Sequence, residues 1–297
     1  MTISEILNAA PLTLSFEFFP PKTEAGETLL TAAVKRLAAV NPSFISVTYG
    51  AGGSTQNKSL QICGALTRQA AFPVMAHLTG ICHTRDEVAE ITDAFWDAGL
   101  RNIMALRGDR PRNAPDWAPI EGGFTYAKDL IAFLKSQHSF CIGGACYPEG
   151  HTETPDISLG VQHAREKVDA GAEFLVTQMF FENARYFDFV ESLRAAGVTV
   201  PVIPGIMPVT GFAQIERFET QFGACLPAEL REKLLTYEGD EIAVGKVGLE
   251  WSVQQCQALL DGGAPGIHFY TLNKSKATVQ VCEQLDLTRR PSSVEVS

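Results

Sequence analysis

Residues 74–109, VMAHLTGICHTRDEVAEITDAFWDAGLRNIMALRGD, show the pattern that decides the fold. An apolar run, Val74–Thr79, is followed by an amphipathic stretch, Arg85–Ala98, and then by Gly99. Glycine commonly follows the last residue of a helix. A second apolar run, Asn102–Asp109, completes the unit. Apolar runs with few polar residues are typical of parallel strands buried on both faces. The stretch therefore predicts a strand, a helix and a second, parallel strand.

The same alternation continues along most of the chain. The other runs that we interpret as strands are Leu14–Phe19, Phe44–Gly50, Ile142–Pro148, Phe174–Phe181, Val200–Met207 and Gly266–Leu272. The other amphipathic stretches are Glu24–Val40, Thr55–Ala70, Tyr126–Ser136, Val161–Ala170, Asn183–Ala196 and Gly211–Gln221, with further helix in Leu226–Asp261. This pattern predicts an α/β fold, a single eight-stranded parallel β/α (TIM) barrel over residues 1–297. An open doubly wound sheet is the alternative, although its usual GxGxxG turn is absent.

Composition narrows the classes of partner and the location. The chain is 45% hydrophobic, which suits a large core, and its net charge of −10 argues against a nucleic-acid partner. No apolar run approaches the ~20 residues that cross a bilayer. Residues Met1–Pro11 lack the basic start of a secretory signal, so we expect a cytoplasmic protein. We expect the polar tail Thr288–Ser297 to be flexible.

The cysteines predict neither a disulfide framework nor a metal centre. There are seven of them, an odd number, and no CxxC pair occurs. Most have apolar neighbours, so we interpret them as buried free thiols. His77 has no neighbours at metal-ligand spacing, and we predict no bound metal.

Active sites of β/α barrels form at the carboxyl ends of the strands. In the first strand, side-chain alternation puts Glu17 on the face of Ser15, while Phe16 and Phe18 point the other way. A carboxylate buried among aromatic residues is costly unless it is paired or protonated. Glu17 is therefore either half of a structural ion pair or a functional acid.

Other strand ends carry weaker signals. Arg107 and Asp109 alternate onto one face and form either a salt bridge or part of a ligand site. His77 is a lone histidine, which is more often a packing residue than a catalyst. Gln178 lies in an apolar run and needs a hydrogen-bond partner. The glycine-rich turn at residues 50–54 is a weak indication of phosphate binding.

Together the strand ends resemble the methylenetetrahydrofolate reductase family, in its bacterial single-domain form. The segments that carry the resemblance occur in order between residues 15 and 274. They are Ser15–Lys22, Ser46–Ala51, Ala76–Thr79, Ala105–Asp109, Tyr147–His151, Lys167–Ala172, Thr177–Phe181, Pro204–Pro208 and His268–Asn273. The joint match is far more specific than any one segment.

The resemblance implies a flavoenzyme that binds FAD non-covalently and reduces 5,10-methylenetetrahydrofolate to 5-methyltetrahydrofolate with NADH or NADPH. The folate and the nicotinamide dinucleotide would take turns on one face of the flavin, in a protein that we expect to be a homo-oligomer. The implied FAD contacts are Thr48, His77, Arg107, Gly108, Asp109, Tyr126, Ala127, Ala145, Tyr147, His151, His163 and Lys167. The implied substrate contacts are Gln178, Gln214, Phe218 and Lys274.

Two carboxylates take catalytic roles by the same resemblance. Glu17 corresponds to the general acid that protonates nitrogen-10 and opens the five-membered folate ring. Ring opening leaves a cationic iminium at nitrogen-5, and Asp109 corresponds to the carboxylate that stabilises this charge.

Three positions depart from the family pattern. Gly160 stands where some members have aspartate, and His163 where they have asparagine, which affects contacts to the adenosine half of FAD. Lys274 replaces an arginine, so the charge stays but the bidentate fork for a carboxylate is lost.

Two other functions fit a folate-binding barrel. One is a flavin-free barrel that transfers a methyl group. The other is a flavoprotein subunit that needs a partner protein as electron donor, since no second redox centre is visible in the sequence.

Overall fold

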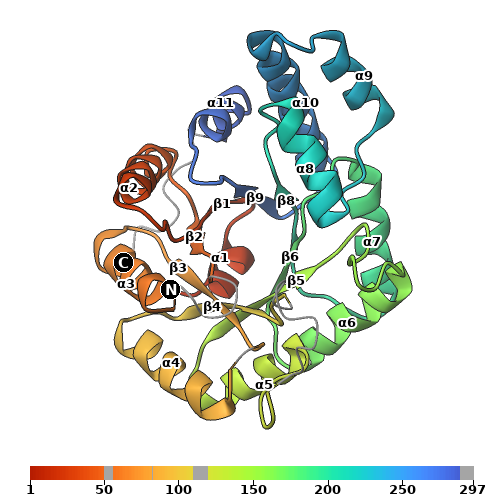
Figure 1. Ribbon diagram of the computed structural model, residues 1–297. Coiled ribbons are helices and arrows are strands. Elements are labelled where there is room, and N and C mark those ends of the chain that lie inside the picture. Colours follow the sequence, from red (N-terminus) through yellow and green to blue (C-terminus); the bar gives the residue numbers. More distant parts are fainter. Residues whose placement is uncertain (50–55, 82, 110–119, 288–297) are drawn as a thin grey trace.

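In a computed structural model, which describes residues 1–49, 56–81, 83–109 and 120–287, a parallel sheet curls into a nearly closed barrel surrounded by helices (Figure 1). The glycine-rich turn at residues 50–54, Cys82 and the tail at 288–297 lie outside the described residues. The strands are β1 (Thr13–Phe18), β2 (Phe44–Val47), β3 (Val74–Thr79), β4 (Asn102–Leu106), β5 (Cys141–Cys146), β6 (Phe174–Thr177), β7 (Val202–Ile203), β8 (Gly205–Ile206) and β9 (Gly266–Tyr270).

Strand order confirms the parallel β/α barrel. The hydrogen-bonded order is β7-β6-β5-β4-β3-β2-β1-β9-β8, and its two ends are consecutive in the chain, separated by Pro204 alone. A doubly wound sheet would instead reverse its strand order part-way across.

The expected number of strands was wrong. The described residues form nine strands, because the predicted strand Val200–Met207 is divided at Pro204 into β7 and β8. Proline has no N–H to donate to a ladder. β7 pairs with β6, whereas β8 pairs with β9, where the His268 N–H donates to the Pro204 carbonyl at 3.0 Å.

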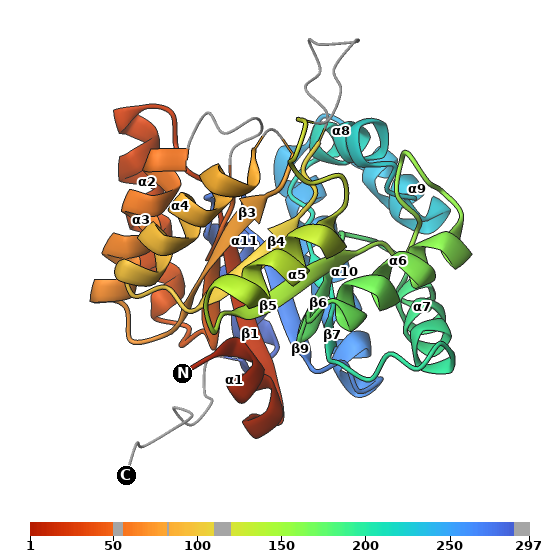
Figure 2. The ribbon, with the colours of Figure 1, turned by 90° about the horizontal axis from the view of Figure 1, so that it is seen from below.

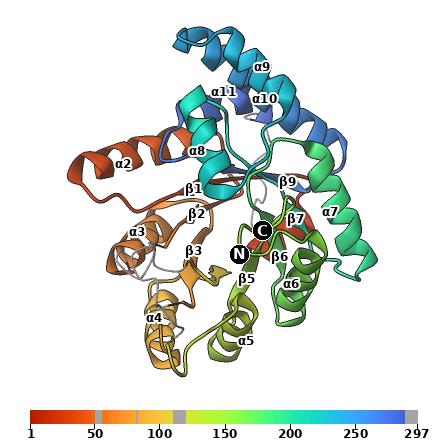
Figure 3. The same cartoon turned by 45° about the vertical axis from the view of Figure 1, so that its right-hand side comes forward.

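The predicted helices are present, with ends that differ by a few residues. They are α2 (Glu24–Ala38), α3 (Gln56–Gln69), α4 (Arg85–Asp97), α5 (Ala127–Gln137), α6 (Ile157–Asp169), α7 (Asn183–Ala195), α8 (Phe212–Phe222), α9 (Ala228–Thr236) and α10 (Glu241–Asp261). A further helix, α11 (Lys276–Gln284), follows β9. Figure 3 shows α8, α9 and α10 gathered on one side of the barrel.

Sequence periodicity missed the short helix α1 (Ile3–Ala9), which lies at the amino-terminal end of the barrel (Figure 2). Ile3 and Leu7 are buried against the residues that fill the barrel interior, including Phe44 and Phe174. The Ile3 N–H donates to Asn102 Oδ1 at 2.8 Å, at the start of β4. The helix thus closes this end, and the opposite end remains for a site.

Side-chain alternation separates two apolar layers. Phe16 and Phe18 belong to the layer between strands and helices, while Met75 and Met104 pack with α1 inside the barrel. Inward and outward positions therefore follow a period of two along each strand.

The cysteine prediction holds for most of the described residues. Cys63, Cys141, Cys146, Cys256 and Cys282 are buried free thiols, whereas Cys225 is free but exposed. Within the described part of the chain, no helix is long and apolar enough to span a membrane.

Candidate active site

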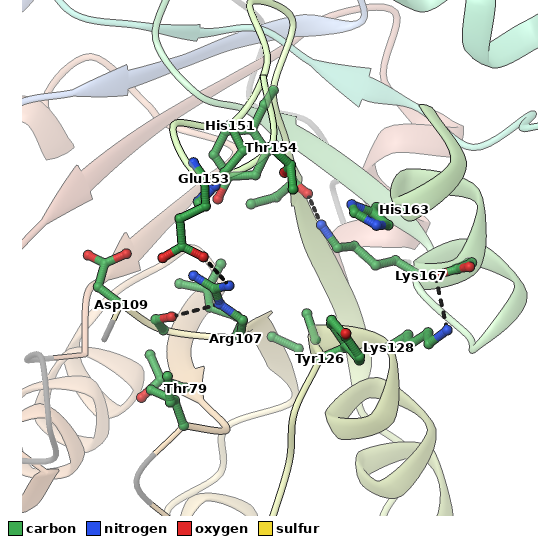
Figure 4. Close-up of a pocket in the computed structure, with 18 of the residues that line it drawn as sticks. Thr79, Arg107, Asp109, Tyr126, Lys128, His151, Glu153, Thr154, His163 and Lys167 are labelled. Atoms are coloured by element: carbon green, nitrogen blue, oxygen red, sulfur yellow. Dashed lines mark hydrogen bonds and ion pairs between the residues drawn. The ribbon is translucent and has the colours of Figure 1, made fainter. Parts of the chain in front are cut away.

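A cavity of about 290 Å³ opens at the carboxyl ends of β4 and β5 and extends between α5 and α6 (Figure 4). We call it the first cavity. All the residues predicted to contact FAD line it except Thr48 and His77. The predicted residues that line it are Arg107, Gly108, Asp109, Tyr126, Ala127, Ala145, Tyr147, His151, His163 and Lys167.

Arg107 lies in the middle of the first cavity. Its Nη1 is 2.7 Å from Glu153 Oε2, and its Nε donates to the Gly108 carbonyl at 3.1 Å. The hydrogen bond that Arg107 donates to Glu153 raises the pKa of the guanidinium further. The ion pair of Arg107 is thus with Glu153, whereas the sequence had suggested Asp109, which is exposed.

Lys167 is the second cation of this cavity. Its Nζ donates to the Ala145 carbonyl at 2.7 Å and lies 5.8 Å from the centroid of the Tyr147 ring. Burial lowers the pKa of Lys167 and raises that of Tyr147 to about 12. Burial and the charge of Arg107 lower the pKa of His151. Cations and neutral aromatic groups therefore line one cavity.

Gly108 brings bare backbone to the cavity wall. Its φ is +90°, and a Cβ there would overlap Ile81 Cγ2 and lie 3.0 Å from Thr79 Cβ. Only glycine fits this position without strain. Bare backbone beside two cations and an aromatic ring is a donor set that fits a flavin dinucleotide, with its pyrophosphate and its flat ring.

A second cavity of about 390 Å³ lies between the start of α8 and the chain that follows β9. It is lined by Gln214, Phe218 and Lys274, three of the predicted substrate residues, and also by Arg217 and Tyr270. Gln178 does not line it, and its own Oε1 accepts the Met179 N–H at 3.1 Å.

Two of these residues are held firmly. Gln214 Oε1 accepts the N–H and the hydroxyl of Thr210, both at 2.8 Å, which fixes the amide at the start of α8. Phe218 is buried with Met179 and Met207, with Tyr270 packed against the cluster. The Tyr270 hydroxyl donates to the Thr177 carbonyl at 2.6 Å.

Glu17 lies inside the barrel between two histidines. Its Oε2 is 3.4 Å from His77 Nε2 and 3.6 Å from His268 Nε2, and its side chain is 18% exposed. His268 Nδ1 is 2.8 Å from Ser15 Oγ. His77 Nε2 is buried without a hydrogen bond, and burial lowers the pKa of this ring.

The expected apolar setting of Glu17 was wrong. Alternation turns Phe16 and Phe18 toward the helices, so the neighbours of the carboxylate are polar rings from β3 and β9. Neither Glu17 nor His77 lines the first cavity. Thr48 also lies outside that cavity, and its carbonyl accepts from Ser59 at 3.3 Å.

Sequence reasoning missed several residues of the site. His268 was visible only as part of a strand end, and its contact with Glu17 arises because β9 pairs with β1, where Ser15 is in register with His268. Glu153 follows the strand-end segment and carried no signal of its own. Across the described residues, no group of three or more potential ligands could hold a metal ion.

Comparison with known proteins identifies the family. A model described as methylenetetrahydrofolate reductase matches residues 2–286. The chain belongs to this family. A relative named 5,10-methylenetetrahydrofolate reductase, from Pectobacterium carotovorum subsp. carotovorum, is 33% identical over 92% of this chain and 90% of its own length.

Longer relatives match over part of their length. Methylenetetrahydrofolate reductase 2 of Saccharomyces cerevisiae is 39% identical and matches 93% of this chain, which spans only 47% of that relative. Methylenetetrahydrofolate reductase (NADH) 1 of Arabidopsis thaliana is 32% identical, with 96% of this chain and 50% of the relative covered. The chain thus spans about half the length of these curated relatives.

Among solved structures, an uncharacterized protein from Clostridium thermocellum that binds two copies of 5-methyl-5,6,7,8-tetrahydrofolic acid has a similar fold. The TM-score is 0.63 at 15% identity, covering 97% of this chain and 99% of the other. At this identity the similarity concerns the fold alone.

Proposed function

We propose that this chain reduces 5,10-methylenetetrahydrofolate to 5-methyltetrahydrofolate with NADH, using FAD held in the first cavity. The observation that carries the proposal is the first cavity, in which nearly all the expected FAD positions meet although they come from β4, β5, α5 and α6. Membership of the family supports both the reaction and the folate substrate.

The first cavity would hold FAD through charge and shape. Arg107 and Lys167 neutralise the pyrophosphate, and the bare backbone of Gly108 allows close approach. When bound, FAD supplies hydride transfer between the nicotinamide and the folate. The protein's share of the work is to bind, orient and protonate.

Glu17 is the proposed general acid. It gives a proton to nitrogen-10 of the folate, the carbon–nitrogen bond breaks with its electron pair going to nitrogen-10, and a cationic iminium forms at nitrogen-5. His77 and His268, within 3.6 Å of the carboxyl, position it and lie within reach to exchange a proton with it. Asp109, at the edge of the first cavity, stabilises the cation.

The second cavity is the proposed substrate side of the site. Phe218 and Gln214 provide an apolar surface and a fixed amide for a flat ring. Gln178, on the chain after β6, stays a proposed substrate contact although it does not line this cavity. Lys274 is exposed at its rim and offers a single point charge to a folate carboxylate. Folate and nicotinamide would occupy this space in turn, which predicts ping-pong kinetics.

NADH is the proposed electron donor. The acidity of the chain disfavours an additional phosphate, and plant relatives carry NADH in their names. Comparison of kcat/KM for NADH and NADPH tests this choice, and a clear preference for NADPH would overturn it.

We further propose that residues 1–297 act as one catalytic domain in a cytoplasmic homo-oligomer. Sedimentation of the purified protein can test the oligomeric state.

An anaerobic rapid-mixing experiment tests the reaction as a whole. The purified protein is mixed with NADH and then with methylenetetrahydrofolate while flavin absorbance near 450 nm is followed. Bleaching by NADH and recovery with the folate are expected. Absence of bound flavin would instead favour the flavin-free methyltransferase, and a flavin that NADH cannot reduce would favour a subunit that needs a partner donor.

A further inference from the structure

Glu149 belongs to a loop that lines the first cavity, although it does not line that cavity itself. The β5–α6 loop (residues 147–155) supplies Tyr147, His151 and Glu153 to the first cavity. The Glu153 N–H donates to His151 Nδ1 at 3.1 Å, and the two residues lie side by side in Figure 4. Glu149 lines neither the first nor the second cavity. Its role therefore has to lie in what its side chain contacts.

The β5–α6 loop is held in shape by its own hydrogen bonds. The Gly150 N–H donates to the Tyr147 carbonyl at 3.1 Å. His151 and Thr154 exchange backbone hydrogen bonds at 3.2 and 2.9 Å. The backbone of Glu149 is thus fixed relative to the residues that line the first cavity.

The Glu149 carboxylate reaches the carboxyl end of α8. Its Oε2 accepts the Cys225 N–H at 3.1 Å, just after the helix ends at Phe222. The two elements also come close at a second point, because a Cβ at Gly223 would lie 3.3 Å from Thr152 Cγ2. The β5–α6 loop therefore borders this end of α8 at two points, although 76 residues of chain separate Glu149 from Cys225.

The helix α8 carries residues of the second cavity. Gln214 lies in its first turn and Phe218 one turn later, and both line that cavity. The hydrogen bonds between Gln214 and Thr210 hold the amino end of the helix. Glu149 holds the carboxyl end. The position of Phe218, between these two points, is thus set relative to the residues of the first cavity.

The Glu149 carboxyl lowers the stability of the fold at this place. Its Oε1 is buried without a hydrogen-bond partner in the described part of the chain, and burial raises the pKa of the carboxyl. The charges of Arg185 and Glu182, at the start of α7, shift this pKa in opposite directions. A buried polar atom without a partner is destabilising. An apolar side chain would avoid this cost, so the carboxyl is explained by what its other oxygen holds.

We propose that Glu149 is a positioning residue, which holds the carboxyl end of α8 against the β5–α6 loop and so sets the distance of Phe218 and Gln214 from the flavin. The inference rests on the proposed function, which assigns the first cavity to FAD and the second to the substrates. Without this contact, α8 keeps its amino-terminal attachment but its other end is less firmly held. NADH and the folate should then bind more weakly, while the flavin keeps its own cavity.

The chain contains a control that loosens α8 from another neighbour. Arg231 on α9 donates through Nη2 to Glu219 Oε1 on α8, so this pair ties α8 to α9. Neither Arg231 nor Glu219 lines the first or the second cavity. Arg231→Met therefore removes one attachment of α8 and leaves its contact with the β5–α6 loop.

The test is rapid mixing of the FAD-loaded full chain with NADH and then with methylenetetrahydrofolate, each over a range of concentrations. In Glu149→Ala the apparent dissociation constants of both substrates should rise about five-fold or more, the lower range for coupling between two sites. The limiting rates at saturating substrate and the dissociation constant of FAD, from flavin fluorescence, should change little. Glu149→Gln keeps an oxygen for the Cys225 N–H and should restore both substrate constants. Arg231→Met should leave all three constants near their unmodified values.

Equal weakening of FAD and of both substrates in Glu149→Ala, with no recovery in Glu149→Gln, would assign Glu149 to the stability of the fold and overturn the inference. Unchanged substrate constants would overturn it as well. If Glu149→Ala fails to fold, Glu149→Asp withdraws the carboxylate from Cys225 by one methylene and should weaken substrate binding in the same way; unchanged binding there would equally contradict the inference. These outcomes leave the proposed function standing. If NADH does not bleach the flavin of the unmodified protein, the proposed function fails together with the inference.

Discussion

Arg107 and Glu153 both line the first cavity and form an ion pair, with 2.7 Å between Nη1 and Oε2. The guanidinium of Arg107, which we propose binds the FAD pyrophosphate, thus already has a carboxylate partner. An incoming phosphate competes with Glu153 for the same N–H donors, because the fork of an arginine has a limited number of them. The pair therefore sets how strongly the cavity binds an anion.

This relationship predicts opposite effects for the two partners. Arg107→Ala should weaken FAD binding by about ten- to a hundred-fold, since hydrogen bonds to charged groups contribute about 1.5–3 kcal/mol. Glu153→Gln keeps the cation and removes the competing charge, so FAD should bind as tightly or more tightly. FAD retained after dialysis measures both. Unchanged retention in Arg107→Ala would remove Arg107 from the set of residues that hold the cofactor.

Lys167 should make the affinity for FAD fall at alkaline pH. Burial lowers its pKa below the ordinary 10.5, so the ammonium loses its proton at a lower pH than an exposed lysine does. FAD affinity should accordingly fall as pH rises, with most of the loss below 10.5. Lys167→Met should bind FAD weakly at every pH and lose this dependence. An identical pH profile in the variant would show that Lys167 does not contact the anion.

Replacing Gly108 by alanine should lower the stability of the fold for two reasons, the backbone conformation and the crowding around the new Cβ. Gly108 and Gly122 both have positive φ, at +90° and +73°, but a Cβ at Gly122 meets nothing within 4 Å. Left-handed backbone costs a non-glycine residue about 1–2 kcal/mol, so Gly122→Ala should lower stability by about that amount. Gly108→Ala adds the overlap with Ile81 and should lose both more stability and FAD affinity. Thermal unfolding and FAD titration of the two variants measure both losses. Equal losses of stability and of FAD affinity in the two variants would show that the neighbours of Gly108 move aside to accommodate a Cβ.

Much of this arrangement was accessible from the sequence, because strand ends in a parallel barrel meet at one end. Runs such as Asn102–Asp109 predicted both a strand and the place of Arg107 and Asp109 at the mouth. Alternation predicted that Glu17 and Ser15 share the inner face, as they do. The expected FAD positions converge for the same reason.

Other features depend on pairings that no local pattern encodes. The contact of Glu17 with His268 requires that the last strand returns beside the first, and the separation of β7 from β8 depends on where Pro204 meets the sheet. Lys128 on α5 forms an ion pair with Glu166 on α6, with 3.0 Å between Nζ and Oε2. The barrel sets which sides of these helices face each other, so each residue considered alone resembles an ordinary surface charge. The short helix α1 has too few residues to show a helical period.

Glu17 offers the most direct test of the mechanism, because its neighbours are known. His77 and His268 lie 3.4 and 3.6 Å from Oε2, so a structural ion pair and a general acid remain two distinct roles for the same carboxyl. Reduction of flavin by NADH needs no proton donor to a folate, whereas opening of the folate ring does. The two half-reactions therefore separate the two roles.

Glu17→Gln should leave the reduction of flavin by NADH near its unmodified rate. It should slow reoxidation by methylenetetrahydrofolate by about 10²–10⁴-fold, the usual contribution of a positioned general acid. Rapid mixing of the FAD-loaded variant, one half-reaction at a time, measures both rates. His268→Gln is the control for positioning, because it keeps the acid but removes one ring beside it, and its loss should be smaller and again confined to the folate step. Equal loss in both half-reactions of Glu17→Gln, together with lower FAD occupancy, would assign Glu17 to a structural ion pair instead.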